Sequence, residues 1–183
     1  MLYVLWAATA LAALTGIAST APTVFEPNLL PVCATETPVG LGPAVSPDTP
    51  AAFLANSVFS ADAIATTTIA GYTIVAVDYH ARAERANVTT MGWLNLPDYD
   101  VTSCSGYCTN TLGCLAFDVF YQRSPTIVPS YNTSCPDPPS MTSVICTIYS
   151  AALTTADMIN TGETRGHFVV VIAGSNLFNK AVP

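Results

Sequence analysis

Five short runs of apolar and β-branched residues predict β-strands in the second half of the chain. They cover residues 72–79, 88–96, 114–121, 144–149 and 167–173. Val, Ile, Thr, Tyr and Phe dominate these runs, and such residues pack well on a pleated sheet. The run at 114–121 is apolar on both faces except for Asp118, so we expect it to lie in the centre of the sheet. Gly174-Ser175-Asn176 is expected to end the last strand.

A different pattern at 101–110 predicts a helix among these strands. Asp100 precedes it, and an aspartate side chain is a favoured acceptor for the free N–H groups of a first helical turn. One helix among about five strands is typical of an α+β domain, which we place at 71–180.

The region before residue 71 is rich in proline. Half of the 14 prolines lie between Pro22 and Pro50. Because proline fixes φ and removes a hydrogen-bond donor, we expect an irregular lead over residues 22–70. Short helical turns are expected within it at 50–56, after the capping residue Asp48 or Thr49, and at 61–64.

The first 18 residues have the pattern of a secretory signal peptide. The segment from Leu2 to Ile17 carries no charge, and the small residues Gly16 and Ala18 precede a cleavage point expected within 18–21. A membrane anchor is the alternative, but the stretch is shorter than the roughly 20 residues of a spanning helix. We therefore expect a secreted protein, extracellular or associated with the cell wall, without a stable membrane anchor.

Charge and cysteine content agree with this interpretation. Five Lys+Arg against twelve Asp+Glu give a net charge of −7, which argues against nucleic acid as a partner because phosphate binding needs clustered cations. The six cysteines form an even set suited to an oxidising compartment. Asn87 and Asn132 each begin an N-glycosylation acceptor sequence, so we expect both at the surface.

The cysteine spacing favours one disulfide pairing. Cys104 and Cys108 lie four residues apart, so both project from the same face of the predicted helix toward a sheet. The favoured pairs are Cys104–Cys146, Cys108–Cys114 and, between two loops, Cys33–Cys135. Six cysteines allow 15 pairings, so this choice is a hypothesis. A zinc site is the alternative, but the spacings lack a C-x2-C pair and His80 and His167 lie in different segments; we expect no metal.

Several motifs together resemble the PAN/apple-like module of secreted ascomycete fungal proteins. They are Tyr99-Asp100-Val101-Thr102-Ser103-Cys104-x3-Cys108-x4-Gly113-Cys114-x2-Phe117, then Arg123-Ser124-Pro125, Cys135, Cys146 and Val170-Val171-Ile172-Ala173-Gly174-Ser175-Asn176. The resemblance covers roughly Cys33 to Asn179. It implies a helix disulfide-stapled across an antiparallel sheet, and binding of proteins or carbohydrates without catalysis. Ser124 stands where the family usually has aspartate, and Ser105-Gly106 where it has two alanines.

Catalytic constellations are weak in this sequence. Asp98, Asp100 and Asp118 are available carboxylates, but no spacing defines the pair that a glycoside hydrolase needs. Gly174-Ser175-Asn176 lacks the second glycine of a serine-hydrolase elbow. Asp118 interrupts an apolar strand, and we expect it to be paired, with Arg123 or Arg165 as partner, because an isolated buried charge is costly. No enzymatic activity and no cofactor are expected.

Aromatic side chains are the candidates for ligand binding. The set comprises Trp93, Tyr99, Tyr107, Tyr121, Tyr131 and Tyr149. Tyr121 and Tyr149 lie in apolar strands and are expected in the core. Tyr131 in the 125–139 loop and Trp93 are the ligand-binding candidates, together with Arg123 from the motif of the resemblance.

The predicted function is a secreted non-catalytic recognition module that binds an extracellular glycan or protein. One alternative is a secreted effector or structural wall protein without a small-ligand site. The other is an unrecognised polysaccharide hydrolase.

Overall fold

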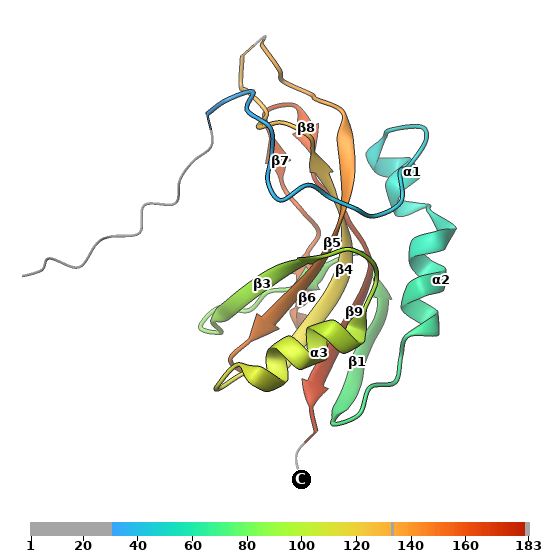
Figure 1. The fold of residues 1–183 in the computed structure, drawn as a ribbon, viewed down its shortest axis with the longest axis vertical. Helices are drawn as coiled ribbons and strands as arrows, with labels where there is room; N and C mark the ends of the chain where they lie inside the picture. Colours follow the sequence, from blue (N-terminus) through green and yellow to red (C-terminus); the bar gives the residue numbers. More distant parts are fainter. Residues whose placement is uncertain (1–30, 133, 182–183) are drawn as a thin grey trace, which may run out of the picture.

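A five-stranded antiparallel sheet forms the centre of the fold (Figure 1). The computed structural model describes residues 31–132 and 134–181, so the predicted signal peptide and the start of the lead lie outside the described residues. The spatial order of the strands is β1 (Tyr72–Tyr79), β9 (Ile172–Lys180), β4 (Ala116–Pro125), β5 (Ser140–Tyr149) and β3 (Thr90–Leu96). The strand that is apolar on both faces, β4, is central as predicted. The α+β class and a sheet of about five strands are confirmed.

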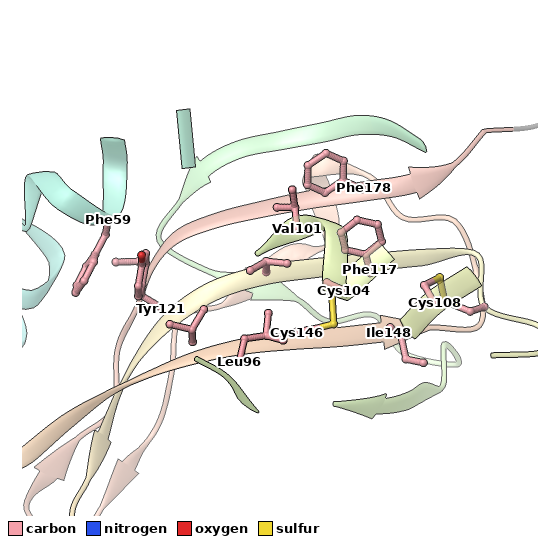
Figure 2. Packing of buried hydrophobic residues seen from close by; sticks show 14 of the residues in the cluster. Phe59, Leu96, Val101, Cys104, Cys108, Phe117, Tyr121, Cys146, Ile148 and Phe178 are labelled. Carbon is pink, nitrogen blue, oxygen red and sulfur yellow. A yellow bond between two sulfur atoms is a disulfide. The ribbon is translucent and has the colours of Figure 1, made fainter. Parts of the chain in front are cut away.

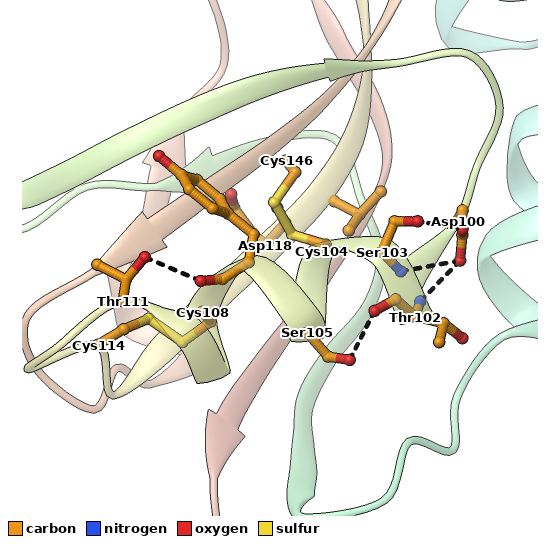
Figure 3. Close-up of a disulfide and its surroundings, with 12 residues drawn as sticks. Asp100, Thr102, Ser103, Cys104, Ser105, Cys108, Thr111, Cys114, Asp118 and Cys146 are labelled. Atoms are coloured by element: carbon orange, nitrogen blue, oxygen red, sulfur yellow. Dashed lines mark hydrogen bonds between the residues drawn. A yellow bond between two sulfur atoms is a disulfide. The ribbon is translucent and has the colours of Figure 1, made fainter.

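Helix α3 (Val101–Asn110) crosses one face of this sheet. Asp100 begins it as predicted, because its Oδ1 accepts hydrogen bonds from the backbone N–H groups of Thr102 (2.8 Å) and Ser103 (3.1 Å), as Figure 3 shows. The Ser103 hydroxyl also donates to Asp100 (2.5 Å). These hydrogen bonds, that of the Ser103 hydroxyl foremost, lower the pKa of the Asp100 carboxyl.

The three predicted disulfides are all present. Cys104–Cys146 joins α3 to β5 and Cys108–Cys114 joins the end of α3 to the chain entering β4 (Figures 2 and 3). The third bond, Cys33–Cys135, joins two loops. Three of these cysteines, Cys104, Cys108 and Cys146, are fully buried, so the bridges are part of the hydrophobic core as well as crosslinks.

The segment before the sheet packs on the same face as α3. Residues 31–49 lie beside the 126–139 loop and pair with it through an isolated β-bridge. Helices α1 (Pro50–Leu54) and α2 (Ser57–Ala65) come next in the chain. Thr49 caps α1, and α2 is longer than the single turn predicted there. Phe59 of α2 stacks on Tyr121 of β4 with ring centroids 4.1 Å apart, as the left of Figure 2 shows. The helical part of the predicted lead therefore belongs to the core of the sheet domain.

The last predicted strand differs from expectation. The run at 167–173 divides between β8 (Phe168–Val169), which pairs with β7 (Thr164–Arg165), and the start of β9. Gly174 does not end β9 but lies within it, at φ +58°. An added Cβ there would lie 2.7 Å from the carbonyl oxygen of Phe59, so glycine allows α2 to approach the strand closely.

The second face of the sheet is only partly covered. Short strands β2 (Arg82–Ala83) and β6 (Met158–Asn160) pair over it, and the 3-10 turn η1 (Thr155–Asp157) leads into β6. Their residues bury one end of this face in a cluster of Ala83, Tyr149, Leu153, Met158 and Leu177. At the other end, the described residues leave two cavities over this face. Within the described residues, no helix is long and apolar enough to cross a membrane.

Candidate functional site

The open end of the second sheet face contains a cavity of about 480 Å³. Because β4 places Phe117, Val119 and Tyr121 in the core beneath α3, strand alternation turns Phe120 and Gln122 to the opposite face. Phe120, Gln122, Ile145 and Thr147 of β4 and β5 line the cavity, and Trp93, Thr90 and Arg82 complete it. A second cavity of about 220 Å³ shares Trp93, Gln122 and Ile145 with the first. We call the two together the sheet-face groove.

Trp93 lies at the edge of this groove. It belongs to β3, which is an edge strand, and pairs with Thr147 of β5. Its exposed fraction is 55%, which is high for the largest apolar side chain. Tryptophan combines a broad apolar surface with one N–H donor, so an exposed ring beside a cavity is suited to ligand stacking.

The other two predicted ligand-binding residues lie elsewhere. Tyr131 is 86% exposed in the 126–139 loop but does not line the sheet-face groove. Arg123 is 4% exposed, and its guanidinium donates to Asp48 Oδ1 from Nε (3.1 Å) and Nη2 (2.8 Å) and to the Val169 carbonyl (2.8 Å). It also lies over the Phe168 ring. The structure therefore does not bring the three together, and Arg123 has a packing role.

The remaining aromatic candidates have structural roles. Tyr121 and Tyr149 are buried, as expected. The Tyr99 hydroxyl donates hydrogen bonds to the carbonyls of Gly174 (2.6 Å) and Val119 (3.0 Å), and burial raises its pKa well above the usual value. These tyrosines hold β4, β9 and the chain before α3 together.

The partners expected for Asp118 are wrong. Its Oδ2 accepts hydrogen bonds from the Ala83 backbone N–H (2.8 Å) and the Tyr149 hydroxyl (3.0 Å). Arg123 and Arg165 form ion pairs with other carboxylates, those of Asp48 and Glu36. Asp118 Oδ1 is buried without a hydrogen-bond partner. Burial raises the pKa of Asp118 to about 7, although the two hydrogen bonds oppose the shift.

Arg82 is the groove residue that the sequence did not reveal. Arg82 lies between the predicted strands 72–79 and 88–96, where no element was expected, but it opens β2, which docks on Asp118 through the next residue. A strand of two residues is too short to show hydrophobic periodicity in the sequence. Phe120 lies in the predicted strand 114–121 but Gln122 lies outside it, and the sequence did not indicate which part of the sheet face would contain a cavity.

The carboxylates considered for catalysis are divided between two places. Asp98 and Asp100 line a separate cavity of about 510 Å³ together with Asp62, whereas Asp118 is buried under β2. Asp62 accepts a hydrogen bond from the Tyr121 hydroxyl (2.6 Å), and Asp100 caps α3. Among the residues that the structure describes, no three His, Cys, Asp or Glu side chains are grouped as metal ligands.

The two predicted glycosylation sites begin at exposed asparagines. Asn87 lies in the turn before β3 at φ +67°, and Asn132 lies in the 126–139 loop. Their modification stays a prediction.

The comparisons with known proteins do not assign a function, so a functional assignment depends on the geometry of the groove. No protein-family model, curated protein or solved structure matches this chain.

Proposed function

We propose that this protein is a secreted, non-catalytic recognition module of PAN/apple-like type that binds carbohydrate at the cell wall or outside the cell. The observation that carries the proposal is Trp93, half exposed at the edge of a cavity on an open sheet face. The disulfide-stapled helix and the antiparallel sheet are the features that the PAN/apple resemblance implied.

The chemistry of the sheet-face groove suits a sugar ring. A pyranose has an apolar face of C–H groups, which stacks on an aromatic ring, and a periphery of hydroxyl groups. Trp93 offers the aromatic ring, and Thr90, Gln122 and Thr147 offer donors and acceptors around it. A few polar groups around an apolar surface are the usual composition of a small-ligand site.

The test is retention of the oxidised mature protein on insoluble chitin, β-glucan and cellulose. Trp93→Ala should abolish retention by whichever polymer binds, with the fold intact by circular dichroism. Leu112→Ala is the matched control, because Leu112 is apolar and 97% exposed on the chain after α3 but does not line the groove. Tyr131→Ala tests the other aromatic candidate.

The results separate the alternatives clearly. Retention lost in Trp93→Ala and kept in Leu112→Ala and Tyr131→Ala supports the groove. Retention lost only in Tyr131→Ala would move the site to the 126–139 loop. If the wild-type protein is retained by no glycan, a protein partner replaces carbohydrate as the proposal.

A further inference from the structure

Among the described residues, Arg82 is the arginine whose side chain makes the fewest hydrogen bonds. Arg85, Arg123 and Arg165 each donate hydrogen bonds to a carboxylate. Arg82, by contrast, makes a single long ion pair with Glu84 (3.5 Å). Burial raises the pKa values of Asp118 and Tyr149, and the Arg82 guanidinium lies close enough to both to oppose this rise, but it donates no well-aligned hydrogen bond to either within the described chain. Its side chain is 28% exposed and lines both the 480 Å³ cavity and a smaller neighbouring one. The guanidinium therefore has donors to offer to a ligand.

Arg82 and Trp93 lie on opposite sides of the same cavity. Trp93 pairs with Thr147, and Thr147 pairs with Asp118, so these residues form one row across β3, β5 and β4. Ala83 hydrogen-bonds to Asp118, which places β2 and Arg82 at the far end of that row. Two strand spacings separate the ends, about 10 Å. One sugar ring with its substituents fits this span.

The charge inside the cavity is opposite to that of the whole chain. The protein has a net charge of −7, yet Arg82 is the one charged residue among those that line the 480 Å³ cavity. The planar guanidinium matches a carboxylate with two parallel hydrogen bonds, which neutral hydroxyl groups cannot do with the same strength. The cavity thus has one charge-selective position opposite one stacking position.

We infer that the sheet-face groove is selective for a sugar that bears a carboxylate, a uronate, with the ring on Trp93 and the carboxylate on Arg82. This inference rests on the proposed function and adds its substrate class. Thr147 and Gln122 on the floor then bond to ring hydroxyls. Glu84 is displaced from Arg82 when the ligand carboxylate binds.

The experiment compares each uronate polymer with its methyl ester, which has the same backbone without the charge. Polygalacturonate, alginate and polyglucuronate are the probes, measured by calorimetry at 0.15 M salt. The wild-type protein should bind one acid form about tenfold or more tightly than the ester, the size expected of charge-assisted hydrogen bonds. Arg82→Gln should remove this preference, because binding of the acid form falls to about the level of the ester.

Two further variants make the test specific. Lys180→Gln removes the same charge at the exposed end of β9 and should keep the preference. Arg82→Lys keeps the positive charge but loses the planar guanidinium, so it should keep part of the preference for the acid form. If Arg82→Gln does not fold, the Arg82→Lys result decides: an undiminished preference would exclude bidentate recognition.

The outcomes distinguish this inference from the proposed function. Equal binding of acid and ester, lost in Trp93→Ala, would overturn the inference and leave carbohydrate binding standing. No binding of any uronate would also overturn it, and retention by the neutral polymers would then decide the proposed function separately.

Discussion

The buried carboxyl of Asp118 should make the stability of this protein fall as pH rises from 5 to 8. Its side chain is fully buried, and its pKa lies at about 7 in the folded protein, against 3.8 for a free aspartate. A raised pKa means that folding favours the protonated form. Asp118 thus contributes most to the free energy of unfolding at low pH. Its contribution decreases as pH rises from 3.8 to about 7, and above the folded pKa it changes no further.

The size of this effect follows from the two pKa values. At 1.36 kcal/mol per unit, the raised pKa of Asp118 lowers the free energy of unfolding by about 4 kcal/mol at pH 8 and by about 2 kcal/mol at pH 5, each relative to low pH. The free energy of unfolding should therefore fall by about 2–3 kcal/mol between pH 5 and pH 8 because of this one group. Asp100 has a lowered pKa through its hydrogen bonds, foremost that from Ser103, and so acts in the opposite sense, but only below about pH 4.

The Asp118→Asn variant isolates the effect. Its amide can still accept from the Ala83 N–H and bond to the Tyr149 hydroxyl. Urea unfolding of both oxidised proteins, followed by Trp93 fluorescence, should show the variant gaining about 2–3 kcal/mol in unfolding free energy on the wild type between pH 5 and pH 8. All other titrating groups are common to the two proteins and cancel. Stability curves that run parallel over this range would refute the reasoning.

Three further predictions concern the fold and its modification. Gly106→Ala should raise the melting temperature by about 2–4 °C, because Gly106 is helical with open space around it; Gly174→Ala, at positive φ beside a carbonyl of α2, should lower it. Replacing both Cys104 and Cys146 by alanine should cost about 4 kcal/mol of unfolding free energy through loss of the crosslink, and a loss under about 1 kcal/mol in urea titration would contradict this origin. Secreted from a eukaryotic host, the protein should lose mass on deglycosylation, and Asn87→Gln should remove one glycan from that total.

The elements and their crosslinks could be predicted because their causes are local. The helix at Val101–Asn110 follows from the Asp100 cap, and the four-residue spacing of Cys104 and Cys108 puts both sulfurs on one helix face. The central place of β4 follows from its apolar residues on both faces. In each case the relevant residues are neighbours in the chain or repeat at the period of the element.

The candidate site could be predicted only in part. Trp93 was a candidate because it is aromatic and lies in a predicted strand, but strand alternation could not tell which face it occupied. The sequence did not indicate the partner of Arg123, because Asp48 lies 75 residues away in the lead. Arg82 was placed in a loop because a two-residue strand has no periodicity to detect.

The sequence by itself thus determined the α+β class, the strands β1, β3, β4 and β5 and the capped helix, and it favoured the disulfide pairing that the structure has, since these depend on propensity, periodicity and cysteine spacing. Only the tertiary structure decided which end of the second sheet face is covered by β2 and β6 and which end stays open beside Trp93. That arrangement depends on contacts between segments far apart in the chain, such as the hydrogen bond from the Ala83 N–H to Asp118. Long-range docking of this kind has no local pattern, because its free energy comes from surfaces that meet only after the chain has folded.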